Sequence, residues 1–415
     1  MEQGYRKAAV IGGGPGGIMA AIRLSELGIG VVLYEKTPRL LNKLRISGKG
    51  RCNLTNASDR EEFLSNILRG ARFFQSAFSR FHNYDLMDYV ESLGVPLKTE
   101  RGNRVFPVSD RAADIADALT AALKHNGVSV RLNCPVTAIT PVEDGFQITA
   151  GGKTRTFSKV ILATGGKSYP GTGSTGDGYG FAASLGHSVT ELAPSLAPII
   201  TVETWPKEAA GLSLKNVGLY AYQKGKRVFY EQGEMLFTHN GVSGPLVLSA
   251  SCHLDGALKP TLSIDLKPAL TEEQLDARLL RDFERYANRE ARNALGDLLP
   301  RSLIPIIVRL WGAGEKVVNQ LTRQERQALI SLLKGLPLTV KQIGPMEAAI
   351  VTRGGVNLKE INPRTMESKV TPGLYFAGEL MDLDGYTGGF NLQIAFATGS
   401  AAGISCAEAL LQKEA

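Results

Sequence analysis

Glycines near the start of the chain have the spacing that binds the phosphates of a dinucleotide. Residues 12–17 read Gly-Gly-Gly-Pro-Gly-Gly and match G-x-G-x-x-G at Gly12, Gly14 and Gly17. Glycine in these places allows a tight turn, a close approach of backbone to a pyrophosphate, and close packing of a helix on a strand. Glu35, 21 residues beyond Gly14, is placed to accept hydrogen bonds from the ribose hydroxyls of adenosine.

The sequence predicts the strands and the helix that must position these residues, on both sides of the glycine loop. The apolar run at 8–11 predicts a buried parallel strand, the pattern over 18–24 predicts a helix that stops at Gly28, and 31–34 predicts a second strand. Phosphates would then meet the free N–H groups and the positive end of the helix. The sequence therefore predicts a dinucleotide site, and this unit alone leaves NAD and FAD both open.

Two later segments bear on that choice. Residues 159–166 (K-V-I-L-A-T-G-G) and 373–379 (G-L-Y-F-A-G-E) each predict a strand that ends in small residues, and a helix is expected over 391–411. In this order, the unit at 8–35, the segment 159–166 and the segment 373–379 with its following helix resemble the flavoproteins with two dinucleotide-binding domains. The resemblance implies an α/β, Rossmann-like domain that binds FAD.

Further motifs carry a closer resemblance that runs nearly from end to end. They are I-S-G-K-G-R-C-N-L-T-N at 46–56, L-F-T-H at 236–239 followed by G-V-S-G-P at 241–245, T-R-G-G-V at 352–356, and G-Y-T-G-G-F-N-L-Q at 385–393. This combination resembles the HI0933-like family of bacterial NAD(P)/FAD-dependent oxidoreductases. Members are linked to aminoacetone oxidation, to reduction of bile-acid intermediates, and to reduction of a uridine in ribosomal RNA to dihydrouridine.

The resemblance implies a set of FAD-binding residues at matching positions of this chain. Around the ADP half they are Gly12, Gly14, Pro15, Gly16, Gly17, Glu35, Lys36 and, through its backbone at the adenine, Val136. Towards the pyrophosphate, ribityl chain and flavin ring they are Lys43, Ser47, Gly48, Gly50, Arg51, Cys52, Ala163, Thr164, Gly165, Gly378, Glu379, Asn391, Leu392, Gln393 and Ile394. The basic pair that usually precedes the SGGG-type loop is here Asn42-Lys43.

The distribution of these motifs predicts an insertion. Cofactor motifs are expected in residues 1–193 and 346–415, and none lies in 194–345. Short alternating runs over 199–270 predict antiparallel strands. Thr271 with Gln274 predicts a capped helix start, and the following stretch to about Leu333 is typical of helices. The fold class is therefore a Rossmann-like FAD-binding domain with an inserted β-rich and then helical domain, and a pocket between the two is the expected place for a substrate.

Catalytic side chains are less well defined than cofactor-binding ones. In a flavoenzyme the cofactor carries the hydride, and the protein orients the substrate and moves protons. His239, which precedes a glycine-rich turn, and Tyr386, in the loop 385–389, are the candidate proton donors. The alternative role for His239, which we favour, is a hydrogen bond within a β unit, and the alternative role for Tyr386 is that of a packing aromatic. Cys52 has no nearby resolving cysteine, and the five histidines are scattered, so no redox pair and no metal site is predicted.

Composition bounds the class of protein. With 415 residues, 43% of them hydrophobic and 21% charged, the chain is globular, of two or three domains. Four widely spaced cysteines exclude a disulfide scaffold, and no signal peptide or membrane-spanning helix is expected, so we predict a cytoplasmic protein. A net charge of +7 permits an anionic partner without requiring one.

Three hypotheses for function remain at this point. The leading one is an FAD-dependent reductase that takes hydride from transiently bound NAD(P)H and reduces an unsaturated substrate, such as a uracil base in ribosomal RNA. The second is a small-molecule oxidase or reductase of the aminoacetone or steroid kind. The third is a binding protein that the flavin stabilises without turnover. The oligomeric state is not predicted.

Overall fold

The structure, a computed structural model, describes residues 7–412, which divide into two compact units. The first consists of residues up to Pro194 together with residues from Ile350 onward, and the second is Ser195–Ala349. The sequence motifs for the cofactor all lie in the first unit, whereas the family motif at 236–245 lies in the second.

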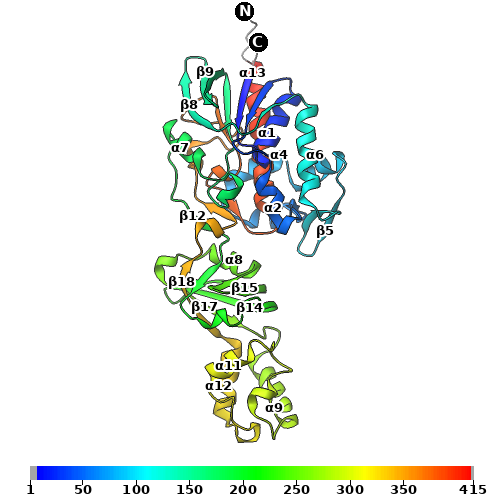
Figure 1. Cartoon of the computed structure of the whole chain (residues 1–415), viewed down its shortest axis with the longest axis vertical. Helices are drawn as coiled ribbons and strands as arrows, with labels where there is room; N and C mark the ends of the chain where they lie inside the picture. Colours follow the sequence, from blue (N-terminus) through cyan, green and yellow to red (C-terminus); the bar gives the residue numbers. More distant parts are fainter. Residues whose placement is uncertain (1–6, 413–415) are drawn as a thin grey trace, which may run out of the picture. The chain divides into compact units, whose positions relative to one another are not determined.

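A five-stranded parallel sheet forms the centre of the first unit (Figure 1). Its strands, in spatial order, are β20 (Leu374–Phe376), β11 (Lys159–Leu162), β1 (Lys7–Ile11), β2 (Gly30–Tyr34) and β7 (Ser129–Arg131). The strands β1 and β11 are buried almost throughout, which explains their continuous apolar sequences. This is the Rossmann-like arrangement predicted from the sequence.

Helices and smaller sheets complete the first unit. The helices are α1 (Pro15–Glu26), α2 (Asn42–Gly50), α3 (Arg60–Ser65), α4 (Ala71–Arg80), α5 (Asn83–Ser92), α6 (Ala112–His125), α7 (Asp177–Ser184) and α13 (Phe390–Gln412). An antiparallel sheet contains β8 (Val136–Val142), β9 (Gly145–Ala150) and β10 (Lys153–Phe157). Short strands β3 (Thr55–Asn56), β6 (Arg104–Pro107) and β5 (Leu97–Glu100) form another, and β4 (Ile67–Arg69) pairs with β21 (Asp384–Gly385).

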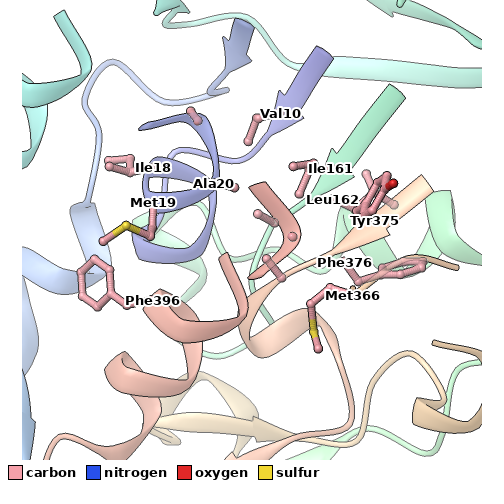
Figure 2. Packing of buried hydrophobic residues seen from close by; sticks show 14 of the residues in the cluster. Val10, Ile18, Met19, Ala20, Ile161, Leu162, Met366, Tyr375, Phe376 and Phe396 are labelled. Carbon is pink, nitrogen blue, oxygen red and sulfur yellow. The ribbon is translucent and has the colours of Figure 1, made fainter. Parts of the chain in front are cut away.

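Small residues bring α13 against α1. A Cβ on Gly399 would lie 2.2 Å from the carbonyl oxygen of Gly16, and one on Gly403 would lie 2.5 Å from that of Ala20. Figure 2 shows Met19 of α1 beside Phe396 of α13, and both side chains are fully buried. The close contact fixes α1, and with it the glycine loop at its start.

The length and composition of α13 would allow it to cross a membrane, which the sequence analysis did not anticipate. Its most apolar window is 72% buried inside the protein, however, and the helix places Gly, Ser, Thr and Gln residues in the core. We therefore describe α13 as the central packing helix of the first unit.

The second unit is built on a closed six-stranded barrel. The strands, in order around the barrel, are β13 (Ile199–Thr201), β16 (Gly241–Ser243), β15 (Lys226–Thr238), β14 (Ser213–Gln223), β17 (Thr261–Asp265) and β18 (Leu336–Ile343). Its helices are α8 (Pro245–Ser251), α9 (Glu272–Arg285), α10 (Ala291–Ala294), α11 (Ile304–Trp311) and α12 (Arg323–Lys334). The Thr271–Gln274 capping box starts α9 as predicted.

The order of elements in this unit corrects one expectation. From the sequence, the strands of this unit were expected to precede its helices, whereas β18 follows α12 and pairs with both β13 and β17. The helical segment is therefore an excursion between two neighbouring strands, and the barrel closes only after the chain returns from it.

Candidate functional site

A pocket in the first unit lies where β1, β2, β11 and β20 end. Sixteen of the residues predicted to bind FAD line it: Gly12, Gly14, Pro15, Gly16, Glu35, Lys36, Lys43, Ser47, Val136, Ala163, Thr164, Gly165, Gly378, Glu379, Asn391 and Leu392. In parallel α/β sheets, ligands bind outside the carboxyl ends of the strands, where the strand order reverses. Here the chain runs from β1 to β2 and β7 on one side, and later adds β11 and β20 on the other side of β1.

The glycine loop is held by backbone contacts that exclude side chains. The N–H of Gly12 donates to the carbonyl of Tyr34 at 2.9 Å, and Gly12 has a φ of +109°. A Cβ on Gly12 would lie 2.4 Å from the carbonyl oxygen of Ala163, and one on Gly17 would lie 1.9 Å from that of Gly12. Glycine is therefore required at both positions.

The start of α1 presents free donors to the pocket. Gly14 is its N-cap without a side-chain cap, Pro15 occupies the first turn, and no acidic residue lies there. The first N–H groups of a helix have no intrahelical acceptor, and the helix dipole adds positive potential at this end. An anionic pyrophosphate satisfies both features.

The carboxylate of Glu35 ties the loop to the end of β2. One oxygen accepts the N–H of Gly13 at 2.7 Å, and the other accepts the N–H and hydroxyl of Thr37 at 2.8 and 2.7 Å. Gly13 and Thr37 line the same pocket and were not among the predicted residues. The role of Glu35 towards a ribose remains a prediction, while its role in shaping the loop is visible in these bonds.

A second glycine segment forms another wall of the pocket. Residues 171–176 also match G-x-G-x-x-G, and Gly173 and Gly176 line the pocket at the start of α7. Lys36 Nζ lies 2.6 Å from Asp177 Oδ2 and also contacts the hydroxyl of Thr175. Burial would raise the pKa of Asp177, but the hydrogen bonds from Lys36 and Thr175 outweigh it and hold that pKa below its usual value. The lysine therefore joins the end of β2 to the second glycine segment.

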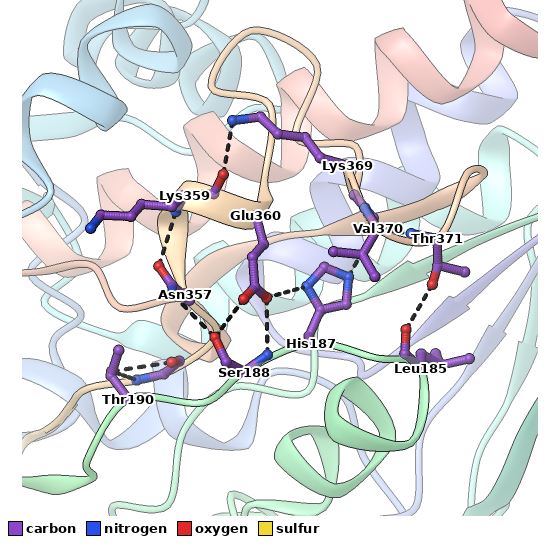
Figure 3. A network of polar contacts seen from close by, with 12 residues as sticks. Leu185, His187, Ser188, Thr190, Asn357, Lys359, Glu360, Lys369, Val370 and Thr371 are labelled. Atoms are coloured by element: carbon purple, nitrogen blue, oxygen red, sulfur yellow. Dashed lines mark hydrogen bonds and ion pairs between the residues drawn. The ribbon is translucent and has the colours of Figure 1, made fainter.

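A buried polar network holds α7 at its other end (Figure 3). His187 Nδ1 lies 3.1 Å from Glu360 Oε2, and its Nε2 lies 2.8 Å from Ser368 Oγ. The Ser368 hydroxyl also accepts the N–H groups of Val370 and Thr371. Burial lowers the pKa of His187, so the neutral ring is favoured there.

Three distant segments meet at Glu379. One oxygen of its carboxylate lies 2.6 Å from Lys43 Nζ, and the other accepts the N–H of Thr352 at 2.8 Å. The hydroxyl of Ser168 lies between them, 2.8 Å from Lys43 Nζ and 3.1 Å from Glu379 Oε1. Lys43 thus neutralises the carboxylate beside the pocket. Ser168 and Thr352 were not predicted as site residues, although Thr352 begins one of the family motifs.

Several predicted cofactor residues do not line the pocket: Gly17, Gly48, Gly50, Arg51, Cys52, Gln393 and Ile394. The guanidinium of Arg51 pairs instead with Glu100 and Asp110 and lies 4.2 Å from the centre of the Phe106 ring. Gln393 is fully buried and bonds to Thr55 and to the carbonyl of Phe81. These two side chains stabilise the protein around the pocket.

Cys52 is a packing residue in this structure. It is fully buried with a φ of +61°, and burial raises the pKa of its thiol to about 12. A thiolate is the reactive form of cysteine, so this side chain is inert at neutral pH.

The two predicted proton donors lie in different surroundings. His239 is exposed in the turn between β15 and β16 of the second unit. Tyr386 is partly buried against the core of the first unit, and its backbone N–H donates to the carbonyl of Asn66. The side chain of Asn391 bonds to Gly385 and Tyr386 and so fixes that loop. Neither candidate lines the pocket, and both assignments stay predictions.

The residues present fit FAD. Besides the N–H groups at the start of α1, the hydroxyl of Thr164 is buried at the pocket wall and has no hydrogen-bond partner among residues 7–412. A ligand with hydroxyls and phosphates supplies acceptors and donors for these groups, since buried polar groups are normally paired. Within residues 7–412, no group of three His, Cys, Asp or Glu side chains is placed to hold a metal.

Fold and pocket together define the class: this is an FAD-dependent oxidoreductase built on a Rossmann-type domain. The model of the HI0933-like protein Rossmann domain matches residues 6–405. The chain belongs to the HI0933-like family.

Curated relatives match along nearly the whole chain. The 3-dehydro-bile acid delta(4,6)-reductase of Clostridium scindens is 31% identical over 412 residues, which covers 97% of this chain and 99% of that protein. The ribosomal RNA dihydrouridine synthase of Escherichia coli is 31% identical over 404 residues, covering 97% and 98%. The enzyme of the same name from Haemophilus influenzae is 28% identical over 406 residues.

Among solved structures, a 3-ketosteroid delta1-dehydrogenase from Sterolibacterium denitrificans has a TM-score of 0.52 and 14% identity. The match covers 97% of this chain and all of that one. An Sdh1 complex of Mycobacterium smegmatis has a TM-score of 0.51 and 16% identity, covering 98% of this chain and 68% of that one. At these identities the likeness concerns the fold.

Proposed function

We propose that this protein is an NAD(P)H-driven reductase of a carbon–carbon double bond conjugated to a carbonyl, and that its substrate is a uridine in ribosomal RNA. The observation that carries the proposal is the pocket at the start of α1, which fits FAD, in a chain that matches two kinds of reductive relative over nearly its full length. The substrates in the names of those two relatives contain the same type of double bond. The ring double bond of uracil and the double bonds of a delta(4,6) 3-oxo bile acid are both conjugated to a carbonyl.

The residues of this chain hold and orient the reactants. The N–H groups at the start of α1 would hold the pyrophosphate, and the Glu35 carboxylate keeps the preceding loop in shape. The Lys43–Glu379 pair stands at the pocket edge with its charges balanced. When bound, FAD supplies hydride transfer between NAD(P)H and the substrate.

Reduction of such a bond needs a proton as well as a hydride. The hydride goes to the carbon distant from the carbonyl, and the proton goes to the carbon beside it. Tyr386 and His239 are the side chains of this chain that we propose as proton donors. The variants Tyr386→Phe and His239→Gln show which of the two is the donor. Loss of the donor lowers turnover without lowering the rate at which NADPH reduces the flavin.

The experiment that tests the substrate is mass spectrometry of ribosomal RNA from a strain that lacks the gene. We expect one dihydrouridine to disappear and to return when the gene is restored. An unchanged dihydrouridine content excludes the RNA substrate.

A small-molecule substrate is the second candidate, because the bile-acid reductase is as similar in sequence as the RNA enzyme. Purified protein supplied with NADPH and a 3-oxo steroid dienone distinguishes the two. An oxidase of the aminoacetone kind would instead release peroxide, which a coupled assay detects.

A further inference from the structure

Three tyrosines form a stacked ladder on the outer face of the barrel in the second unit. Tyr220 and Tyr230 lie directly opposite each other in the β14–β15 pairing, with ring centres 4.4 Å apart and planes 28° apart. Tyr222, two residues from Tyr220 on the same face, adds a third ring at 6.5 Å and 17°. The side chains between them, Ala221 and Phe229, point into the barrel core and are buried.

Part of this ladder remains open to solvent. Tyr230 is 44% exposed, although it is a large aromatic residue on a β-strand. A cross-strand aromatic pair stabilises a sheet by about 0.2–1 kcal/mol, so stacking between strands accounts for the Tyr220–Tyr230 contact. It does not account for the exposed outer ring.

Positive charge surrounds the ladder at the hairpin end. Lys224 and Gly225 form the two-residue turn, both with positive φ, and Lys226 and Arg227 follow as exposed side chains. Arg227 lies opposite Tyr222 in the pairing. Between residues 220 and 230 the sequence has three cations and no acid.

The nearest acids are turned away or engaged. Glu231 lies opposite Leu219, whose side chain is in the barrel core, and so belongs to the other face of the ribbon. Asp255 approaches the hairpin end through its N–H, which donates to the side chain of Gln223, while its carboxylate accepts the N–H of Ala257. Asp265 is buried and ion-paired with Lys334 at 2.6 Å.

We propose that Tyr220, Tyr222 and Tyr230, together with Lys224, Lys226 and Arg227, form a docking surface for single-stranded RNA. Aromatic side chains on β-strands stack with unpaired bases, and cations beside them neutralise phosphates. Ribosomal RNA supplies such single-stranded loops around a target uridine. This inference rests on the proposed RNA substrate and adds a binding surface made of residues of the second unit.

The test measures binding of a fluorescein-labelled single-stranded oligouridylate by anisotropy, with the flavin-containing full-length protein. We expect Tyr230→Leu to weaken binding about tenfold, the loss of one stacked base, and Tyr230→Phe to retain it. We expect Lys226→Gln with Arg227→Gln to make affinity less dependent on salt, because the log–log slope falls by about 0.7 for each phosphate that is no longer neutralised. Tyr84→Leu, which removes a tyrosine 47% exposed in the first unit, is the matched control.

Two further measurements separate this inference from the proposed function. Bleaching of the flavin by NADPH stays at the wild-type rate in Tyr230→Leu, which also shows that the variant folds. Equal affinity of Tyr230→Leu and wild type for the oligonucleotide overturns the docking surface. Absence of NADPH bleaching in the wild type overturns the proposed function and leaves the binding result unaffected.

Discussion

The two glycine segments of the pocket, 12–17 and 171–176, share one spacing and differ in what holds them. In the first, Gly12 and Gly17 face backbone atoms of neighbouring segments so closely that no Cβ fits. In the second, no heavy atom of residues 7–412 lies within 4 Å of a Cβ on Gly171, and a Cβ on Gly173 would lie 2.8 Å from a side-chain atom, Cγ2 of Thr37. The first loop is built by a strand, a helix and their contact, whereas the second depends on its turn and on Lys36. Equal spacing therefore does not mean equal constraint.

The largest effect is expected from Gly17→Ala. The new Cβ would overlap the carbonyl oxygen of Gly12, and backbone cannot rotate away as a side chain can. Overpacking commonly costs about 1–3 kcal/mol, and we expect at least the upper end of that range, with loss of bound flavin. Thermal unfolding and the flavin-to-protein ratio measure it. Gly171→Ala, at an open position, is the control and should change stability by less than about 0.5 kcal/mol. Equal losses of stability at the two positions would contradict the difference in constraint between the two glycine segments.

A smaller loss is expected from Glu35→Gln. The variant removes the charge from a carboxylate that accepts three hydrogen bonds around the first loop. Hydrogen bonds to charged groups contribute about 1.5–3 kcal/mol, so affinity of the apoprotein for FAD should fall about tenfold or more. Titration of apoprotein with FAD gives the dissociation constant. Glu26→Gln, on the surface of α1, should leave it unchanged. Wild-type affinity in Glu35→Gln would mean that the carboxylate does not shape the loop.

The polar network of His187, Glu360 and Ser368, which follows the second glycine segment and α7, should make stability depend on pH. Burial lowers the pKa of His187 in the folded protein, so the unfolded chain takes up a proton first as pH falls below about 6.5. Stability is then present at pH 7 and is lost as pH falls through the interval below 6.5. Glu360, whose pKa is lowered, contributes a loss only below its usual value of 4.5.

Melting temperatures of wild type and His187→Gln between pH 7 and 5.5 check this. We expect the melting temperature of the wild type to fall more between pH 7 and 5.5 than that of the variant, although the variant has the lower melting temperature at pH 7. His253, whose pKa burial also lowers, lies in the second unit and contributes equally to both proteins. Parallel curves would show that His187 is not the titrating group.

The smallest effect is expected from Asp177→Asn. Its ion pair with Lys36 is partly exposed, at 27% and 46% of the two side chains, and such pairs contribute about 0.2–1 kcal/mol. Chemical denaturation should therefore show a loss below about 1 kcal/mol with flavin still bound. A loss as large as that of Gly17→Ala would mean that the second loop is constrained as tightly as the first.

The same contrast explains what could be predicted from the sequence. The strand, loop, helix, strand and acid of 8–35 were predictable because each residue type there answers to local backbone geometry. The Glu379 network was not, since Lys43, Ser168 and Thr352 are separated by more than a hundred residues and meet only in the fold. Arg51 lies inside a family motif, yet its partners Glu100 and Asp110 come from elsewhere. The strand β18 was missed because its pairing with β13 and β17 spans the helical excursion.

The most direct test of the central claim is anaerobic mixing of the purified, flavin-containing protein with NADPH, followed by an acceptor. We predict that NADPH bleaches the flavin absorbance and that a uridine-containing ribosomal RNA fragment restores it, with one dihydrouridine formed for each flavin reoxidised. Flavin that NADPH leaves yellow, or that is reoxidised only when oxygen is admitted, would contradict the account.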